Sequence, residues 1–267
     1  MVKFLMFLQP PTTNNGQQTT DNKMNRYTLL TFLLLALSFA SCRKEQMPAP
    51  EPGVVVDQPI PDTLRYLALG DSYTIGQSVS YEGRWPVQLA AQLRAEFSDT
   101  IYYIEEPDIV ARTGWTTTNL LQAIAAADTL TPPYGLVSLL IGVNNQYQNR
   151  PIEIYRIEFR ELLEQAISFA GGDTTRVIVL SIPDYAFTPF GQGSSNPGLT
   201  SMQIDQYNTI NREITDSYGV AYFDITPISR QGLAQPGLVA SDGLHPSGAM
   251  YELWVEEVLD YVVGVLK

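Results

Sequence analysis

The feature that most constrains the fold of this chain is a regular alternation of short apolar runs with longer amphipathic segments. Runs such as LRYLALG, YGLVSLLIG and RVIVLSIP are almost wholly apolar and end in glycine or proline. Strands of this kind are typical of a parallel sheet that is buried on both faces. The sequence predicts five such strands, at 64–70, 101–111 (broken by Pro107), 134–142, 176–183 and 220–226.

The segments between the strands carry the signals of helices. The clearest, 151–172, has a proline in its first turn and a glycine pair at its end. The full set of expected helices is 84–97, 116–127, 151–172, 201–219 and 248–266. Strands alternating with helices predict a three-layer α/β/α sandwich with a five-stranded parallel sheet. Residues 63–267 fit one such domain, with no internal repeat and no second domain.

The N-terminal part of the chain differs from this domain. Residues 24–42, MNRYTLLTFLLLALSFASC, have a basic start, an apolar run and then small residues, which is the pattern of a secretory signal peptide. The apolar run is short for a membrane span. We therefore expect residues 1–41 to be a signal peptide. Met24 is the alternative start, because residues 1–23 show no clear pattern.

The only cysteine of the chain, Cys42, ends this segment in the sequence FASC. The ending resembles a bacterial lipobox, in which the cysteine is lipidated and becomes the mature N-terminus, although Phe39 replaces the usual aliphatic residue. An ordinary secretory signal with a chance cysteine is the alternative. Residues 42–62 contain five prolines and no amphipathic period, which predicts an extended tether. We expect a protein of the bacterial cell envelope, anchored to the membrane through Cys42 and facing the periplasm or the cell surface.

Composition excludes several classes of function. The formal net charge of −12 repels phosphate backbones, so nucleic acid is not an expected partner. One cysteine and one histidine exclude an intrachain disulfide framework and argue against a structural zinc site. Histidine is the residue type whose ordinary pKa suits proton transfer near neutral pH. Either His245 is the base of an active site, or the chemistry uses no histidine, or there is no chemistry.

Small and polar residues follow the predicted strands. In an open α/β sheet, sites lie where the carboxyl ends of the strands meet. The first strand leads into GDSYTIG with Ser72, the second into RTGWTT with Gly114, and the third into GVNNQY with Asn144. The loop after the fifth strand leads to DGLHP, with Asp242 and His245. The sequence therefore predicts a hydroxyl, an imidazole, a carboxylate and hydrogen-bond donors at one edge of the sheet.

These four blocks, in this order, resemble the SGNH hydrolases, also called the GDSL esterase and lipase family. The resemblance covers roughly residues 64–267 and implies a carboxylic ester hydrolase with a flavodoxin-like fold that needs no metal and no cofactor. In this family the third block usually reads G-x-N-D, whereas Asn145 occupies the last position here. This difference puts a neighbouring hydrogen bond in doubt rather than the oxyanion contact of Asn144.

Acyl transfer gives each candidate residue a role. The hydroxyl of Ser72 needs a base to become a nucleophile, and His245 carries the only imidazole. Asp242, three residues earlier in a glycine-containing turn, is placed to orient that imidazole. Asp242 could instead only stabilise its turn, which would leave a Ser–His dyad. The backbone N–H groups of Ser72 and Gly114 and the side-chain amide of Asn144 are the candidate donors of an oxyanion hole.

Each candidate also has a purely structural explanation. Ser72 stands where a serine commonly caps the following helix, and Gly114 and Asn144 suit ordinary turns. His245 could be a surface residue before a proline. Asp71 is adjacent to Ser72, but neighbours on an extended segment point in opposite directions. We therefore interpret Asp71 as a support for the turn.

Three functions remain open on the sequence alone. The first is hydrolysis of small-molecule or polysaccharide esters through an acyl-serine. The Gly-, Ser- and Pro-rich segment 184–199 favours short acyl or carbohydrate O-acetyl groups over a lysophospholipase or lipase type of substrate. The second is flavin binding with DSYTIG as a phosphate cradle, although a fuller Ser/Thr/Gly loop would be expected. The third is a non-catalytic, glycan-binding surface lipoprotein. Aromatic residues that could stack on a sugar or line an acyl groove are Tyr73, Trp115, Tyr147, Tyr185, Phe187 and Phe190.

Overall fold

The computed structural model of the chain describes residues 62–97 and 102–267. The predicted signal peptide (1–41), Cys42 and all but the last residue of the predicted tether lie outside the described residues. That last residue, Asp62, is the first residue of strand β1 (Asp62–Leu64). Within the two described ranges, no helix combines the length and the apolar character needed to cross a membrane.

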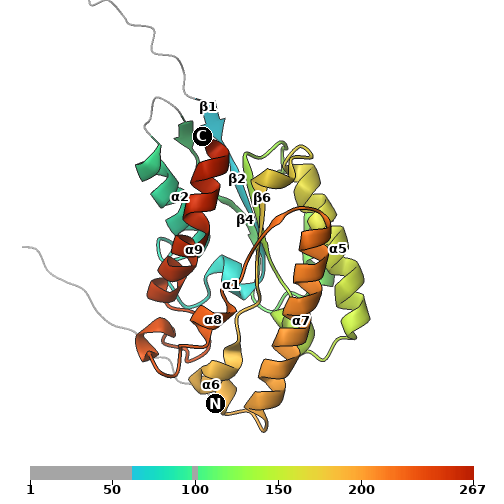
Figure 1. Cartoon of the computed structure of the whole chain (residues 1–267), viewed down its shortest axis with the longest axis vertical. Coiled ribbons are helices and arrows are strands. Elements are labelled where there is room, and N and C mark those ends of the chain that lie inside the picture. Colours follow the sequence, from blue (N-terminus) through green and yellow to red (C-terminus); the bar gives the residue numbers. More distant parts are fainter. Residues whose placement is uncertain (1–61, 98–101) are drawn as a thin grey trace, which may run out of the picture. The chain divides into compact units, whose positions relative to one another are not determined.

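The centre of the described structure is a five-stranded parallel sheet (Figure 1). In spatial order its strands are β4 (Asp108–Ala111), β2 (Tyr66–Gly70), β5 (Leu136–Leu140), β6 (Val177–Leu180) and β7 (Ala221–Phe223). In order of appearance along the chain these are strands 2-1-3-4-5, the doubly wound order of flavodoxin-like folds. The predicted fold class is confirmed.

The register of the sheet brings three strand ends to the same level. Gly70 at the end of β2 pairs with Ala111 of β4 on one side and with Leu140 of β5 on the other. The chain reverses its winding direction between β2 and β5, and ligands of such sheets bind at this point, outside the carboxyl ends of the strands. The connections that start after these three strands therefore begin side by side.

The segment 101–111 forms two strands rather than the single interrupted strand that the sequence predicts. Its first part is β3 (Tyr102–Ile104), which pairs in parallel with β1 in a separate two-stranded sheet. Its second part is β4, at the edge of the main sheet. Pro107 separates the two parts, and because proline has no backbone N–H it is a natural boundary between strands.

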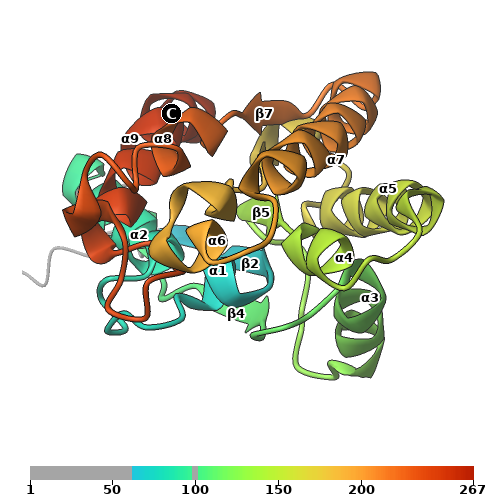
Figure 2. The same ribbon diagram turned by 90° about the horizontal axis from the view of Figure 1, so that it is seen from below.

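Helices cover both faces of the main sheet (Figures 1 and 2). Two pack against each other on one face, and three cover the other face. The first pair is α2 (Trp85–Glu96) and α9 (Gly248–Leu266), and the second group is α3 (Thr117–Ala126), α5 (Ile152–Phe169) and α7 (Pro197–Ser217). Helix α7 begins four residues before its predicted start, because Asn196 accepts a hydrogen bond from the Leu199 N–H (3.0 Å) and caps it.

Short helices follow the strands, and Figure 2 shows α1 and α6 in the middle of this view, between α8 and α4. Their bounds, with those of the 3-10 turns, are α1 (Ser72–Ile75), α4 (Val143–Tyr147), η1 (Thr174–Arg176), η2 (Tyr185–Phe187), α6 (Pro189–Gln192), α8 (Thr226–Ser229) and η3 (Pro236–Leu238). Four of them, α1, α4, η2 and α6, contribute Ser72, Asn144, Tyr147, Tyr185 and Phe190 to the candidate site. Gly114, Asp242 and His245 lie in loops.

Candidate active site

The turn from β2 into α1 places Ser72 at the carboxyl edge of the sheet, where it is largely buried but lines a cavity. A Cβ on Gly70 would lie 2.2 Å from the Thr74 hydroxyl and 2.5 Å from the Leu140 carbonyl oxygen, so the turn requires glycine here. Asp71 caps α1 by accepting a hydrogen bond from the Tyr73 N–H (3.0 Å). Ser72 is thus the first helical residue, and its cap is supplied by the preceding side chain.

A cavity of about 350 Å³ lies over this turn. Four of the sequence-predicted site residues line it, namely Ser72, Gly114, Asn144 and His245. The fifth, Asp242, does not line the cavity and contacts His245 instead. The other lining residues are Tyr73, Thr113, Val143, Tyr147, Tyr185, Phe190 and Leu244. The fold therefore brings the hydroxyl of the first strand end and the imidazole of the last loop into one cavity.

Asp242 and His245 form a tight pair in the loop before α9. The Nδ1 atom of His245 lies 2.6 Å from Oδ2 of Asp242, and the other carboxylate oxygen accepts the backbone N–H groups of Leu244 (2.9 Å) and His245 (3.0 Å). Gly243 between them has a φ of +73°, which allows the carboxylate to fold back on the imidazole. With Nδ1 as the donor, Nε2 carries a lone pair that can accept a proton.

The carboxylate of Asp242 is strongly stabilised in its ionised form. Partial burial raises its pKa, but hydrogen bonds from the Ser78 hydroxyl (2.6 Å), from His245 and from Leu244 outweigh burial and hold the pKa well below its usual range. The carboxylate is therefore charged throughout the neutral range. A charged partner on Nδ1 stabilises the imidazolium that forms when Nε2 takes a proton.

The opposite wall of the cavity carries hydrogen-bond donors. Gly114 has a φ of +84°, a left-handed conformation that favours glycine, and no protein atom lies within 4 Å of where its Cβ would be. One N–H of the Asn144 amide is donated to the Trp115 carbonyl (3.0 Å). An amide nitrogen carries two hydrogens, so the bond to Trp115 does not use both of them. The same amide also interacts with the Asp71 carboxyl group.

Asn145, where the family pattern has aspartate, takes part in the same wall. Its side chain is fully buried, its oxygen accepts the Thr117 N–H (3.0 Å), and its nitrogen donates to the Thr117 hydroxyl (2.7 Å). These two bonds join the segment after β5 to the start of α3. At this position an amide thus makes two hydrogen bonds to one residue of the neighbouring helix.

Aromatic side chains form the outer part of the cavity. The rings of Tyr147, Tyr185 and Phe190 are mutual neighbours, with centroids 6.1–6.5 Å apart. Tyr147 is 55% exposed and Phe190 is 45% exposed, and both line the cavity. We call these three residues the aromatic wall. Of the other candidate aromatics, Tyr73 lines the cavity, whereas Trp115 and Phe187 do not.

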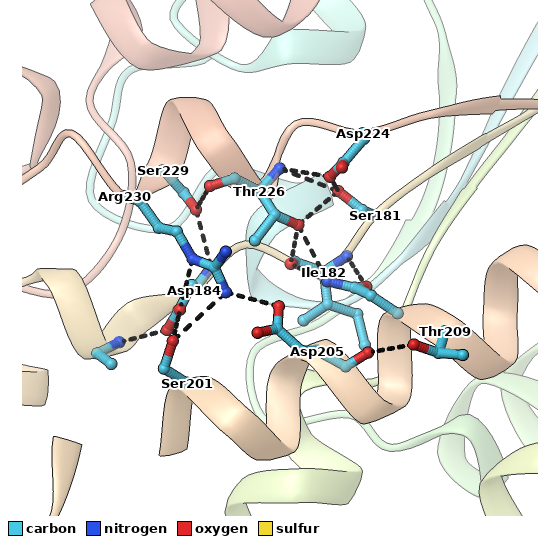
Figure 3. A network of polar contacts seen from close by, with 12 residues as sticks. Ser181, Ile182, Asp184, Ser201, Asp205, Thr209, Asp224, Thr226, Ser229 and Arg230 are labelled. Atoms are coloured by element: carbon cyan, nitrogen blue, oxygen red, sulfur yellow. Dashed lines mark hydrogen bonds and ion pairs between the residues drawn. The ribbon is translucent and has the colours of Figure 1, made fainter. Parts of the chain in front are cut away.

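A buried ion pair fixes the segment that carries two residues of this wall (Figure 3). Asp184 is fully buried, accepts the Ala186 N–H (3.0 Å), and is bonded by Arg230 Nε (3.0 Å). Its own N–H donates to the Ser229 hydroxyl (2.8 Å), and Arg230 also binds Asp205 of α7 (2.6 Å). The network joins α7 and α8 to the turn that starts the segment of Tyr185 and Phe190.

Asp71, behind Ser72, is in a very different environment. It is fully buried, and burial raises its pKa to about 7, with the N–H groups of Tyr73 and Gly142 and the amide of Asn144 opposing the rise. Its Oδ2 atom has no hydrogen-bond partner among the described residues. The carboxyl group therefore titrates near neutral pH, directly behind the candidate nucleophile.

The sequence of this domain matches a known family. The GDSL-like lipase/acylhydrolase family matches residues 68–253, which span all four blocks of the site. The chain belongs to this family. It is a carboxylic ester hydrolase, and the resemblance that the four blocks predict is confirmed. No curated protein matches the sequence.

Several solved structures of esterases share the fold of this GDSL-family chain. Axe2, an acetylxylan esterase from Geobacillus stearothermophilus, is 18% identical with a TM-score of 0.57, covering 76% of this chain and 95% of Axe2. LAE5, an α/β hydrolase from the metagenome of Lake Arreo, is 19% identical (TM-score 0.57; 78% and 98% covered). A lipolytic G-D-S-L family protein of Veillonella parvula is 17% identical (TM-score 0.55; 74% and 97%). At these identities the likeness concerns the fold.

Two residues of the site are absent from the sequence-based set. Ser78 bonds the acid of the candidate pair, but an exposed serine in a turn gives no signal in the sequence. Asn145 is visible in the sequence only as a departure from the family pattern. No group of His, Cys, Asp and Glu side chains in the described ranges is arranged to hold a metal ion.

Proposed function

We propose that the protein hydrolyses acyl esters through a covalent acyl-serine on Ser72. The observation that carries this proposal is the shared cavity of Ser72 and His245, with Asp242 bound to the far nitrogen of the imidazole. His245 Nε2 accepts the hydroxyl proton as the Ser72 oxygen attacks the ester carbonyl. The imidazolium then returns this proton to the alcohol that leaves, and water attacks the acyl-serine by the same route in reverse.

The developing negative charge on the ester oxygen needs donors placed in advance. We assign this role to the backbone N–H groups of Ser72 and Gly114 and to the side-chain amide of Asn144. Gly114 and Asn144 line the cavity with Ser72 and are joined through Trp115, whose carbonyl holds the amide. Losing one donor of such a set typically costs about 3 kcal/mol of barrier, on the order of a hundredfold in rate.

The nucleophile is tested with Ser72→Ala and a serine-directed fluorophosphonate. We expect the wild type to hydrolyse nitrophenyl acetate and to gain one reagent adduct on the peptide that contains Ser72, located by mass spectrometry. The variant should lose both properties. Because the base is an imidazole, wild-type activity should also fall as the solution becomes acidic. Hydrolysis by Ser72→Ala at the wild-type rate would remove the acyl-serine from the mechanism.

For the substrate we propose short acyl groups, and O-acetyl esters of carbohydrates in particular. The cavity of about 350 Å³ lies at the small end of ligand sites, which suits a short acyl chain. The half-exposed rings of Tyr147 and Phe190 present flat apolar faces on which a sugar ring can stack. Axe2, which has the same fold, is an acetylxylan esterase.

A chain-length series separates this substrate from the lipase or lysophospholipase alternative. Nitrophenyl acetate should be hydrolysed faster than the octanoate, and acetylated xylan should release acetate. Tyr147→Ala should raise KM for acetylated xylan several-fold and leave nitrophenyl acetate unchanged, because the small ester does not reach the aromatic wall. A rate maximum at long acyl chains would favour the lipase type. Glycan binding without hydrolysis by the wild type would favour the non-catalytic alternative.

For the location we propose the bacterial cell envelope, with the chain anchored through acyl groups on Cys42. The support is the sequence alone, in the lipobox-like ending and the proline-rich tether that follows. Expression of the full chain in a bacterium should place the wild type in the membrane fraction, labelled by radioactive palmitate. Cys42→Ser should be unlabelled and released by osmotic shock. A wild type that is released without label would leave an ordinary secretory signal as the explanation.

A further inference from the structure

The nucleophile and the turn that follows it form one structural unit. The N–H of Gln77 donates to the carbonyl oxygen of Ser72 itself (3.0 Å), and Gly76 closes α1 in a left-handed conformation, with a φ of +67°. Further along the turn, the N–H of Val79 donates to the carbonyl oxygen of Gly76 (3.3 Å). Residues 72–79 are therefore bonded to one another over a short distance, and a displacement of the turn displaces Ser72.

Ser78 in this turn bonds the acid of the candidate triad. Its hydroxyl donates to Oδ2 of Asp242 (2.6 Å), the same oxygen that lies 2.6 Å from Nδ1 of His245. Ser78 has a φ of +69°, a left-handed conformation that residues with a side chain rarely adopt. Glycine or asparagine would be the usual choice at such an angle, and neither carries a hydroxyl. The backbone is thus held in an unfavourable conformation at a residue whose side chain meets the acid.

This hydrogen bond and the edge-on contact of the Tyr73 ring with the imidazole of His245 (centroids 5.6 Å apart) connect two halves of the site. Among the hydrogen bonds of the described residues, the Ser78 bond is the one that joins the segment 71–80 to the loop 240–246. The neighbouring side chain, Gln77, accepts a hydrogen bond from the Thr113 hydroxyl (2.7 Å), and Thr113 precedes Gly114. The turn therefore contacts the loop of the acid and base on one side and the loop of an oxyanion donor on the other.

We propose that Ser78 is a positioning residue, whose hydroxyl holds the loop of Asp242 and His245 at the correct separation from Ser72. The inference rests on the proposed acyl-serine function, because it assigns Ser78 a role in the same site. Ser78 touches neither the cavity nor the substrate and acts through Asp242. With the hydroxyl present, the carboxylate is bound from both sides and the imidazole is aimed at the nucleophile. Without it, the acid–base loop loses its bond to the nucleophile turn.

The decisive variant is Ser78→Ala. It removes the hydroxyl but keeps a Cβ, so the left-handed backbone is as unfavourable as with serine. The bond is exposed to water, so we expect kcat for nitrophenyl acetate to fall about five-fold, with KM within a factor of two. The single histidine supplies an independent readout. Its Nδ1–H proton should give one assignable downfield NMR signal, and this signal should move in Ser78→Ala. A wild-type kcat with an unmoved imidazole signal would overturn the proposal.

Two matched variants separate the hydroxyl from the turn. Ser80→Ala changes an exposed serine two residues further on and should leave kcat and the imidazole signal as in the wild type. Ser78→Gly also lacks the hydroxyl, so its kcat should fall as much as that of Ser78→Ala. Because glycine suits the left-handed backbone angle, Ser78→Gly should unfold at a higher denaturant concentration than Ser78→Ala. Recovery of kcat in Ser78→Gly, or an equal loss in Ser80→Ala, would mean that the backbone of the turn matters and the hydroxyl does not.

The outcome can be read independently of the nucleophile assignment. If Ser72→Ala hydrolyses esters at the wild-type rate, the acyl-serine mechanism fails. The position of the imidazole signal in Ser78→Ala still reports whether the hydroxyl holds the Asp242–His245 pair. If Ser72→Ala is inactive and the signal does not move, the proposed function stands and the role of Ser78 falls.

Discussion

Asp71 and Asp242 are two carboxyl groups of the candidate site, and their environments differ in opposite directions. Asp71 is fully buried and accepts the Tyr73 N–H at Oδ1, and the Gly142 N–H and the Asn144 amide also lower its pKa without offsetting burial. Asp242 is partly exposed and accepts four hydrogen bonds, from the Ser78 hydroxyl, the Leu244 N–H, and two groups of His245. Burial raises the pKa of the first to about 7, and hydrogen bonds keep the pKa of the second far below its ordinary value.

The comparison shows that hydrogen-bond donors set against burial decide which carboxyl group keeps a low pKa. A third group, Asp184, is as buried as Asp71 but has Arg230 as a partner. Among these three groups, the one that contacts the imidazole, Asp242, is also the one with the most donors. Asp71 caps the turn that carries Ser72, and Asp184 supports the aromatic wall.

The largest effect is expected from Asp242→Asn. An amide in this place can turn its N–H toward Nδ1 of the imidazole, which then holds the wrong tautomer and offers no lone pair to the Ser72 hydroxyl. We expect kcat for nitrophenyl acetate to fall by about 10³-fold or more, measured at the pH of maximum wild-type activity. A fall of less than tenfold would show that the site operates as a Ser–His dyad, the alternative that the sequence leaves open.

The second effect concerns how the free energy of unfolding changes with pH. Asp71 should lower this free energy as pH rises, whereas Asp242 should raise it. The folded pKa of Asp71 lies above its ordinary value of 3.8, so the folded state binds more protons and loses stability as pH rises from about 4 to about 7. A shift of about three units corresponds to roughly 4 kcal/mol. Asp71→Asn keeps an acceptor for the Tyr73 N–H and should lack this decline, as measured by urea unfolding across that range.

The matched comparison is Asp242→Asn in the same unfolding series. The folded pKa of Asp242 is lowered, so its ionised form contributes stability above its ordinary pKa of 3.8, and that contribution is lost as pH falls toward the folded pKa. The advantage of the wild type over Asp242→Asn should therefore grow with rising pH in the acid range. By contrast, the stability of the wild type relative to Asp71→Asn should decrease as pH rises. Parallel profiles for the two variants would contradict the electrostatic contrast between the groups.

The smallest of the three effects is expected from Arg230→Met. Removing the cation leaves the buried Asp184 with neutral donors, which should cost about 2 kcal/mol in the free energy of unfolding, because Arg230 is itself partly exposed. KM for acetylated xylan should rise, since the segment of Tyr185 and Phe190 loses its support. Arg212→Met is the control. This exposed cation makes a 3.8 Å pair with Asp216 and lies 5.2 Å from the centre of the Tyr222 ring, so its loss should cost under about 1 kcal/mol.

How far the sequence predicts this molecule depends on the range of the interactions involved. Buried apolar runs are local signals, so all five strands of the main sheet could be predicted from the sequence alone. The separate pairing of β3 with β1 could not, because it depends on a chain path through Pro107. The candidate site residues follow strand ends, and parallel strands bring their ends together, so Ser72, Gly114 and Asn144 were expected near His245.

What could not be predicted lies in side chains that meet across long stretches of sequence. The bond from Ser78 to Asp242 joins a turn to a loop 164 residues away, and an exposed serine carries no local mark of it. The ion pair of Arg230 with Asp184 could not be predicted either, because the two residues are distant in the sequence. The opposite electrostatics of Asp71 and Asp242 arise from burial and donor number, which are properties of packing rather than of residue type.

The order of the site along the chain has a consequence for its synthesis. The imidazole lies just before α9, and Ser247, two residues after it, caps this last helix of 19 residues. His245 comes after Ser72 in the chain, so during synthesis the hydroxyl is made before the imidazole that we propose as its proton acceptor. If the proposed mechanism holds, a chain cut before His245 should not hydrolyse esters, although it would still contain Ser72, Gly114 and Asn144.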